Sequence, residues 1–221
     1  MKIRTLAATI LALGLSACSA EFAPVSIYSI CAPPQPDTTT GACLYPATCE
    51  AGFAGTPVLD VTTALVDFQL PFQINNALTN NASTTDGRIN TNDAFIQTLE
   101  MTYSGGTLEP WSVSQAITVP TSGSSGALLR LIPFQYFPLM VPPGSSTTSL
   151  VVSVRARGIL ASQDSFTTAW FQVPVTVCAG CLDFNVCGTG SVLVAFCPAT
   201  APGAISPGQS ASILCADVTA P

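Results

Sequence analysis

The sequence predicts an all-β protein: an antiparallel β-sandwich of the immunoglobulin or fibronectin type, stabilised by disulfides and with few or no helices beyond its N-terminal segment. Apolar and polar residues alternate over many short segments, which is typical of half-buried strands. Clusters of Gly, Pro and Ser separate these segments, as in turns between strands. No window after the N-terminal segment shows a capped 3.6-residue period. Apolar residues make up 48% of the chain, which is enough for a core.

About eight strands are expected, and the clearest lies within 65–74. Its apolar side contains Val66, Phe68, Leu70, Phe72 and Ile74. The next repeats the pattern over 95–103, where Gln97 is the one exception on the apolar side formed by Phe95, Leu99, Met101 and Tyr103. A third covers Trp111, Val113, Ile117 and Val119, and later strands are expected at 128–137, 150–156, 166–177, 191–196 and 210–217.

Aromatic residues raise two expectations. We expect Trp111 and Trp170 in the core. The run 132–143 combines aromatics with prolines, which cannot donate ladder hydrogen bonds, and it is therefore expected to be an edge strand. Its aromatics would either form an exposed edge that docks a partner protein or glycan, or be split between core and rim: Phe134, Tyr136 and Phe137.

The N-terminus carries an export signal. Lys2 and Arg4 precede an uncharged run at 6–15 that is too short to span a bilayer. The tetrapeptide Leu15-Ser16-Ala17-Cys18 that closes this run resembles the lipobox of bacterial lipoproteins. The resemblance implies cleavage before Cys18, its lipidation, and a mature chain of residues 18–221. An ordinary secretory peptide, cut after Ala17 or Ala20, is the alternative.

The resemblance also implies a location. Ser19 follows Cys18, which favours sorting to the outer membrane, where several acyl chains would hold the protein stably. We therefore expect a signal peptide at 1–17, a lipidated Cys/Pro-rich tether at 18–56, a sandwich core at 57–177 and a Cys-rich segment at 178–221 packed on it. The Pro/Thr stretch 32–40 would act as a spacer from the membrane.

The composition excludes several classes of function. The mature chain has four arginines, no lysine and twelve carboxylates, a formal charge of −8, which makes nucleic acid an unsuitable partner. The whole chain lacks histidine, which removes Ser-His-Asp and Cys-His catalysis. No nucleotide-binding motif is present. We expect no catalytic residue, no bound metal and no cofactor.

Eight cysteines remain if Cys18 carries lipid, and export to an oxidising compartment predicts that they form disulfides. The eight are Cys31, Cys43, Cys49, Cys178, Cys181, Cys187, Cys197 and Cys215. Three precede the cysteine-free centre and five follow it. Since both groups are odd, complete pairing requires at least one bridge between them, which would bring the two ends of the chain side by side.

Three other sites are alternatives. The pair Cys178 and Cys181 has the C-x-x-C spacing of thiol-disulfide exchange proteins. Cys178, Cys181, Cys187 and Cys197 could formally bind zinc. The polar segment 75–93 offers oxygen donors for calcium at Asp86, Asp93, Asn80, Asn81, Asn90 and Asn92, although it lacks the EF-hand spacing; a solvated hairpin connection is the simpler interpretation.

These observations favour an outer-membrane-anchored lipoprotein that serves as a non-catalytic structural or binding module, on the periplasmic or cell-surface side. Its partners would be the membrane, through the lipid on Cys18, and an envelope protein or glycan. A thiol-disulfide exchange protein and a calcium-dependent adhesin are the alternatives from other classes.

Overall fold

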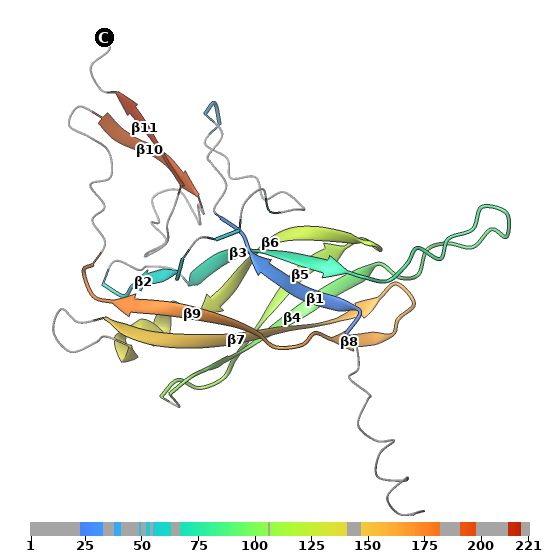
Figure 1. Cartoon of the computed structure of the whole chain (residues 1–221), viewed down its shortest axis with the longest axis horizontal. Helices are drawn as coiled ribbons and strands as arrows, with labels where there is room; N and C mark the ends of the chain where they lie inside the picture. The colour runs from blue at the N-terminus through green and yellow to red at the C-terminus, as the bar shows by residue number, and fades with distance from the viewer. Residues whose placement is uncertain are drawn as a thin grey trace, which may run out of the picture.

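Two sheets form the body of the molecule (Figure 1). The computed structural model describes residues 23–32, 38–40, 49, 52–53, 55–62, 67–105, 107–140 and 147–181, and the backbone of 191–197 and 212–217. The first sheet has the order β1-β3-β6: β1 Val25–Ile30, β3 Phe68–Asn76 and β6 Gly123–Ile132. The second has the order β2-β9-β7-β4-β5: β2 Val58–Asp60, β9 Phe171–Cys178, β7 Thr148–Leu160, β4 Ala94–Tyr103 and β5 Trp111–Val119. The short β8, Ser165–Thr167, pairs with β7.

This architecture confirms the predicted all-β sandwich. Among the described strands, every pair is antiparallel except β2 and β9, which run parallel. A separate two-stranded sheet joins β10, Ser191–Cys197, to β11, Ser212–Asp217. The one helix in the described residues is the 3-10 helix η1, Phe134–Leu139. No helix in this part of the chain is long and apolar enough to cross a membrane.

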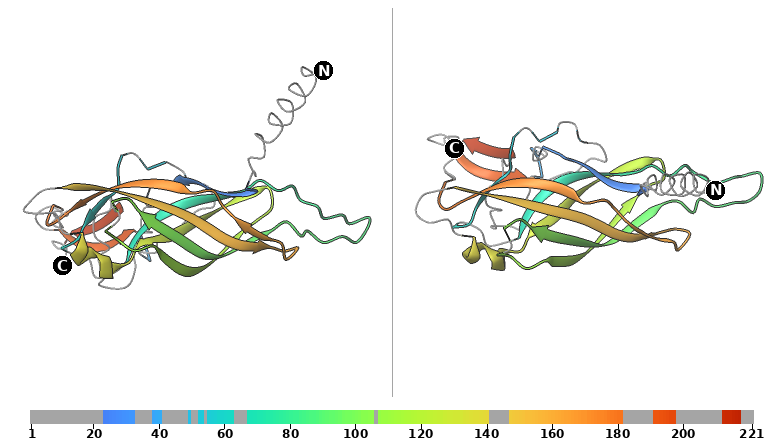
Figure 2. Two further views of the ribbon diagram at one scale, coloured as in Figure 1. Left: turned by 90° about the horizontal axis from the view of Figure 1, so that it is seen from below. Right: turned by 60° about the horizontal axis from the view of Figure 1, so that its bottom comes forward.

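The core lies between the facing sides of the two sheets (Figure 2). In β3, the predicted alternation places Phe68, Leu70, Phe72 and Ile74 wholly inside. Large apolar side chains of the second sheet bury with them: Leu99, Met101, Val152, Val154, Val173 and Val175. Each such burial stabilises the fold by about 1.5–3 kcal/mol. The phenol of Tyr103 donates a 2.9 Å hydrogen bond to the Leu131 carbonyl, and burial raises the pKa of this phenol.

A β-bulge in β4 explains the exception at Gln97. The pairing of β4 with both neighbours shifts register between Ile96 and Thr98. The extra residue reverses which side chains face the core, so Ile96 is buried while Phe95 is exposed, contrary to the predicted alternation. Gly158 of β7 lies opposite Ile96, and a Cβ there would collide with the backbone oxygen of Phe95.

The expected edge strand over 132–143 was wrong. Strand β6 ends at Ile132, and the chain turns at Pro133 into η1, which contains Pro138. Prolines hold φ near −65°, which suits a 3-10 turn and interrupts a ladder. The aromatics are split as the second interpretation had it: Phe137 is buried, Tyr136 packs edge-on against Tyr103, and Phe134 is exposed.

Strand β1 lies inside the range predicted to be a tether. It pairs with β3 along its length, and the backbone N–H of Ala77 donates to the Pro24 carbonyl at 2.8 Å. Among the described residues the sandwich therefore begins at Val25, and the stretch 32–40 follows β1 in the sequence. Cys18 lies outside the described residues.

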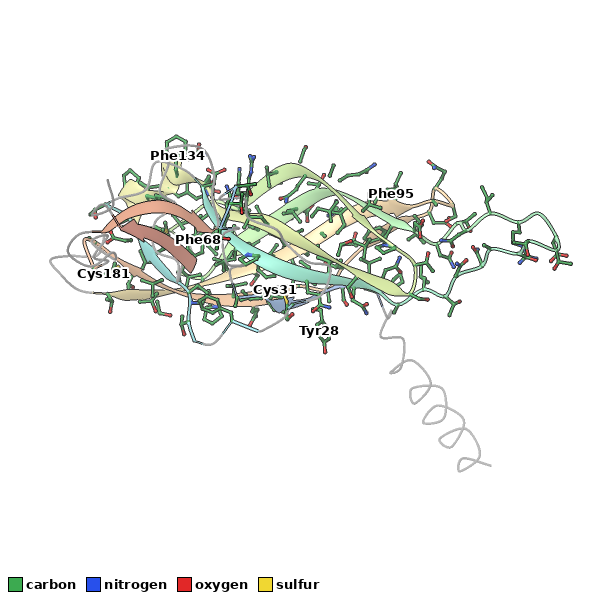
Figure 3. The ribbon with its side chains drawn as sticks, turned by 90° about the horizontal axis from the view of Figure 1, so that it is seen from above. Tyr28, Cys31, Phe68, Phe95, Phe134 and Cys181 are labelled. Carbon is green, nitrogen blue, oxygen red and sulfur yellow. A yellow bond between two sulfur atoms is a disulfide. The ribbon has the colours of Figure 1, made fainter. Side chains whose placement is uncertain are left out.

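The molecule is elongated, and its two ends differ (Figure 3). The connection 77–93 between β3 and β4 projects from one end as a long hairpin. Cys181 marks the opposite end, near η1 and the exposed Phe134. The start of β1 pairs with Asn76, at the base of the hairpin, so the N-terminus of the described chain lies at the hairpin end.

Candidate functional site

The candidate site lies where β2 and β9 end side by side. Their parallel pairing aligns Asp60 with Cys178, and the backbone N–H of Val61 donates to the Cys178 carbonyl at 2.9 Å. The chain then turns through Gly180, whose φ of +66° suits glycine, and a disulfide joins Cys178 to Cys181. Residues 58–60 and the start of the second cysteine group therefore lie side by side, whereas the two described disulfides each lie within one group.

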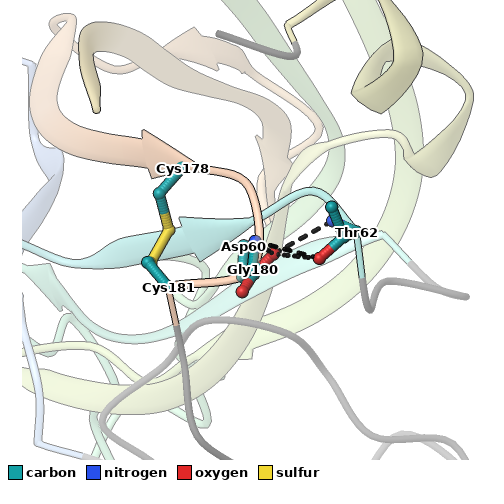
Figure 4. Close-up of a disulfide and its surroundings, with 5 residues drawn as sticks. All are labelled: Asp60, Thr62, Cys178, Gly180 and Cys181. Carbon is teal, nitrogen blue, oxygen red and sulfur yellow. Dashed lines mark hydrogen bonds between the residues drawn. A yellow bond between two sulfur atoms is a disulfide. The ribbon is translucent and has the colours of Figure 1, made fainter. Parts of the chain in front are cut away.

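Asp60 holds this turn in place (Figure 4). Its side chain is fully buried, and its Oδ1 accepts hydrogen bonds from Thr62 N at 3.0 Å, Thr62 Oγ1 at 2.7 Å and Gly180 N at 2.9 Å. Gly180 N also donates to Thr62 Oγ1 at 3.0 Å. Burying a carboxylate is unfavourable unless such donors replace water. The carboxylate thus joins two segments that are 120 residues apart.

Asp60 was not among the predicted site residues. The sequence did carry a signal for it. Asp60 directly follows the apolar run 57–59, and a threonine stands two residues later. An Asp side chain in such a place often accepts a hydrogen bond from the backbone N–H two residues on. What the sequence alone could not supply was the partner, since Gly180 is remote in the chain.

The site can be judged for metal binding and for thiol chemistry. One ligand atom from each of Asp60, Cys178 and Cys181 lies within 4.8 Å of the others. Zinc requires thiolates, however, and in the disulfide neither sulfur is one. The other two cysteines of the zinc alternative, Cys187 and Cys197, have no described side chains. In the structure, Cys178 and Cys181 thus form a disulfide and do not act as metal ligands.

Access to the disulfide is one-sided. Cys178 is buried and Cys181 is exposed, so an entering thiolate could reach only the sulfur of Cys181. The sulfur of Cys178 would then leave as a thiolate, next to the Asp60 carboxylate and out of water. Both surroundings disfavour a negative sulfur, which makes it a poor leaving group. The geometry suits a bridge that stays closed.

A second disulfide secures β1. Cys31 follows this strand directly and is bonded to Cys49, and the backbone N–H of Phe53 donates to the Ile30 carbonyl at 3.0 Å. Disulfide stabilisation is thus present at both ends of the sequence. Cys43 and Cys187 lie outside the described residues, and Cys197 and Cys215 are described only as backbone positions of β10 and β11.

Most of the predicted oxygen donors of the hairpin 77–93 accept hydrogen bonds from the hairpin itself or from Thr121. Asn80, Asn81 and Asn90 each accept from a backbone N–H of the hairpin, at 2.8–3.1 Å. Asp86 forms an exposed 3.8 Å ion pair with Arg88. Asp93 accepts from Asn90 Nδ2, Thr121 N and Thr121 Oγ1. A calcium ion would have to displace these bonds, so the arrangement favours the interpretation as a hairpin connection.

A third cluster lies on the outer face of the second sheet. Glu100 of β4 accepts a 2.7 Å hydrogen bond from Arg155 Nε and forms a 2.8 Å ion pair with Arg157 Nε, both on β7. The Arg155 guanidinium lies 4.3 Å from the ring centroid of Trp170. Trp170 is 41% exposed, so its expected place in the core was wrong, whereas Trp111 is half-buried against the core. Two arginines two residues apart in a strand were the overlooked signal.

No family model, curated protein or solved structure matches this chain. The function therefore has to be argued from the site geometry and the sequence.

Proposed function

We propose that this protein is an outer-membrane lipoprotein, anchored through Cys18, whose disulfide-clamped sandwich serves as a non-catalytic binding module of the cell envelope. The lipobox resemblance supports the anchor. The two disulfides support export, because such bonds persist in oxidising compartments. The closed surroundings of Asp60 and Cys178 support a structural role for the C-x-x-C pair.

The position of β1 carries this proposal. Only seven residue steps separate Cys18 from Val25, the first residue of the sandwich, and a fully extended chain spans at most about 25 Å over that distance. An acylated Cys18 would keep the folded body close to the bilayer by its hairpin end. The opposite end, with η1 and Cys181, would face away from the membrane (Figure 3).

The reach of the hairpin is similar. Residues 77–93 form two arms of about eight residues each, and at about 3.3 Å per residue the tip extends at most roughly 25 Å from the sandwich. Most residues of the arms are polar, and Ile89 is their exposed large hydrophobic residue. Such a polar hairpin would contact the hydrated headgroup layer and hold the sandwich away from the membrane, which leaves the faces of the sheets accessible.

The intact mass of protein extracted from membranes tests the anchor, measured without reductant after thiol alkylation. We expect a chain starting at Cys18 with added acyl mass and no alkyl adducts. The matched variant Cys18→Ser should be released from the membrane fraction with its fold unchanged by circular dichroism. A lipid-free chain that starts after Ala20 would contradict the proposal.

Thiol-disulfide exchange is the second candidate function, and the exposure of Cys181 in the C-x-x-C disulfide is the observation that favours it. An exchange function is distinguished from a structural disulfide by treating the folded protein with a series of glutathione redox buffers, followed by alkylation and peptide mapping. A structural bridge stays oxidised until the protein is unfolded. Alkylation of Cys178 and Cys181 in the folded protein under mild glutathione would favour an exchange role.

A further inference from the structure

The outer face of the second sheet carries an unbalanced positive cluster, formed by Glu100, Arg155, Arg157 and Trp170 and called here the guanidinium face. Both guanidinium groups form an ion pair with the same carboxylate, in each case with Nε as the nearest nitrogen. Their terminal nitrogens have no hydrogen-bond partner within the described part of the chain. Two positive charges therefore meet one negative charge.

This imbalance is particular to the guanidinium face. The mature chain has only two other arginines, and each has an acid of its own: Arg88 with Asp86 at 3.8 Å, and Arg130 with Asp67 at 4.0 Å. In a chain of formal charge −8, the guanidinium face is the place where described cationic groups outnumber the acids that contact them. A local surplus of this kind suits an anionic ligand.

The surroundings combine an exposed aromatic ring with polar side chains. Trp170 is 41% exposed and presents part of its ring to solvent beside the cluster. The cross-strand neighbours are hydroxyl and amide side chains: Ser112 opposite Glu100, Ser114 opposite Thr98, and Gln172 opposite Ser153. An aromatic ring can stack on the C–H face of a sugar, and hydroxyl and amide groups hydrogen-bond to its hydroxyls.

An acidic peptide suits this surface less well. At the cluster, strand β7 pairs with β4 on one side, while on the other side β9 covers it up to Val154 and β8 covers it at Arg157, so its backbone has no free edge here that a peptide strand could extend. The outward side chains of β4 and β5 beside the cluster are mainly Ser, Thr and Gln, which offer no apolar pocket to a peptide side chain.

We propose that the guanidinium face binds an acidic sugar residue of an envelope glycan, with the sugar carboxylate at the terminal nitrogens of Arg155 and Arg157 and the ring against Trp170. This names the ligand class of the proposed binding module and rests on that proposal. It does not depend on the anchor, because the guanidinium face is formed by the sandwich alone.

The test measures binding of oligogalacturonate to the detergent-extracted, full mature protein by calorimetry and by tryptophan fluorescence. We expect saturable binding that weakens as salt is added, and no binding of the methyl-esterified oligomer, which lacks the charge. Arg157→Gln should weaken binding about tenfold, the scale of one charge-assisted hydrogen bond. Arg130→Gln is the matched control, because both side chains are 53% exposed, and it should bind normally.

Glu100→Gln separates a ligand site from a structural ion pair. Removing the competing carboxylate leaves both guanidinium groups for the ligand, so affinity should rise severalfold even if thermal stability falls. Equal losses in the Arg157→Gln and Arg130→Gln proteins, or no binding of oligogalacturonate by wild type, would overturn the proposal. Equal binding of poly-glutamate would assign the guanidinium face to acidic peptides instead. A lipid-free intact mass, by contrast, would refute the anchor and leave this result standing.

Discussion

Asp60 shows how one buried side chain can order the end of a fold. Its Oδ1 receives three donors, two from Thr62 and one from Gly180, at the point where β2 and β9 end. Without Asp60, the N–H of Gly180 would lose its charge-assisted acceptor. The loop closed by Cys178 and Cys181 would then form fewer hydrogen bonds to the end of β2. The residue is therefore structural first, whatever chemistry its neighbours allow.

Replacing Asp60 with Asn should destabilise the protein by about 1–3 kcal/mol, because the amide lacks the charge and adds two donors that need partners in a buried place. Urea unfolding followed by tryptophan fluorescence measures the change. Asp86→Asn, at the exposed tip of the hairpin, is the control and should lie within about 0.5 kcal/mol of wild type. Equal stability of the Asp60→Asn protein would show that the carboxylate is dispensable.

Asp93 predicts a pH dependence. The Thr121 hydroxyl and backbone N–H, with Asn90, hold the pKa of this carboxyl below its ordinary value of 3.8. The folded state thus favours the ionised form, so the stabilisation is complete above pH 3.8 and is lost as pH falls through the lower pKa of the folded protein. Asp93→Asn should be less stable than wild type at pH 7, and the difference should shrink below pH 3.8. A difference that is independent of pH would contradict this assignment.

At the scale of elements, η1 shows what an apolar run with prolines can become. Pro133 precedes it and Pro138 lies inside it, and the turn it makes directs Phe137 inward and leaves Phe134 at the surface. The element closes one end of the core below Tyr103, on which Tyr136 packs. Its sequence resembles a strand only if the prolines are given too little weight.

The two phenylalanines of η1 give a matched pair of substitutions. Phe137→Ala should cost about 3–5 kcal/mol, because it leaves a cavity in the core. Phe134→Ala removes an exposed ring and should change the free energy of unfolding by less than about 0.5 kcal/mol. Chemical denaturation of both variants measures the contrast. Similar costs for the two would mean that η1 is not seated as described.

Elements were predictable to different degrees, for physical reasons. Period-two alternation identified β3 and most of β5, because burial of one face is a local property of a strand. The composition of 166–177 indicated a strand there, which the structure divides into β8 and β9. The bulge at Gln97 reversed the faces of β4 at Phe95, and a single insertion of this kind leaves only one irregular position in the sequence. Of the candidate site, the cysteines were predictable, while Asp60 and the guanidinium face depend on strand register.

At the scale of the whole molecule, the two described disulfides sharpen the parity of the cysteines. Cys31 pairs with Cys49 before the cysteine-free centre of the sequence, and Cys178 pairs with Cys181 after it. With Cys18 lipidated, one cysteine remains in the first group and three in the second: Cys43, Cys187, Cys197 and Cys215. If all of these are oxidised, Cys43 must be bonded to one of the last three.

Peptide mapping without reductant should therefore recover a peptide containing Cys43 that is linked to one from 182–221. A bridge across more than 100 residues is worth on the order of 4–5 kcal/mol in the chain-entropy model, so Cys43→Ser should lower the melting temperature by several degrees. Recovery of Cys43 as an alkylated free thiol would contradict the predicted bridge and leave an unpaired cysteine in the C-terminal group as well.

The place of β1 also determines how the protein would carry mechanical load. With Cys18 in the bilayer, a pull on the body acts along β1, which would shear its hydrogen bonds to β3 together, not open them in turn. Should β1 slide out, tension passes next to Cys31 and crosses directly to Cys49, 18 residues on. The disulfide keeps the intervening chain, about 60 Å when extended, out of the load path. Under load, such a module would lengthen only by the segment from Cys18 to Cys31. The rest of the sandwich would stay folded.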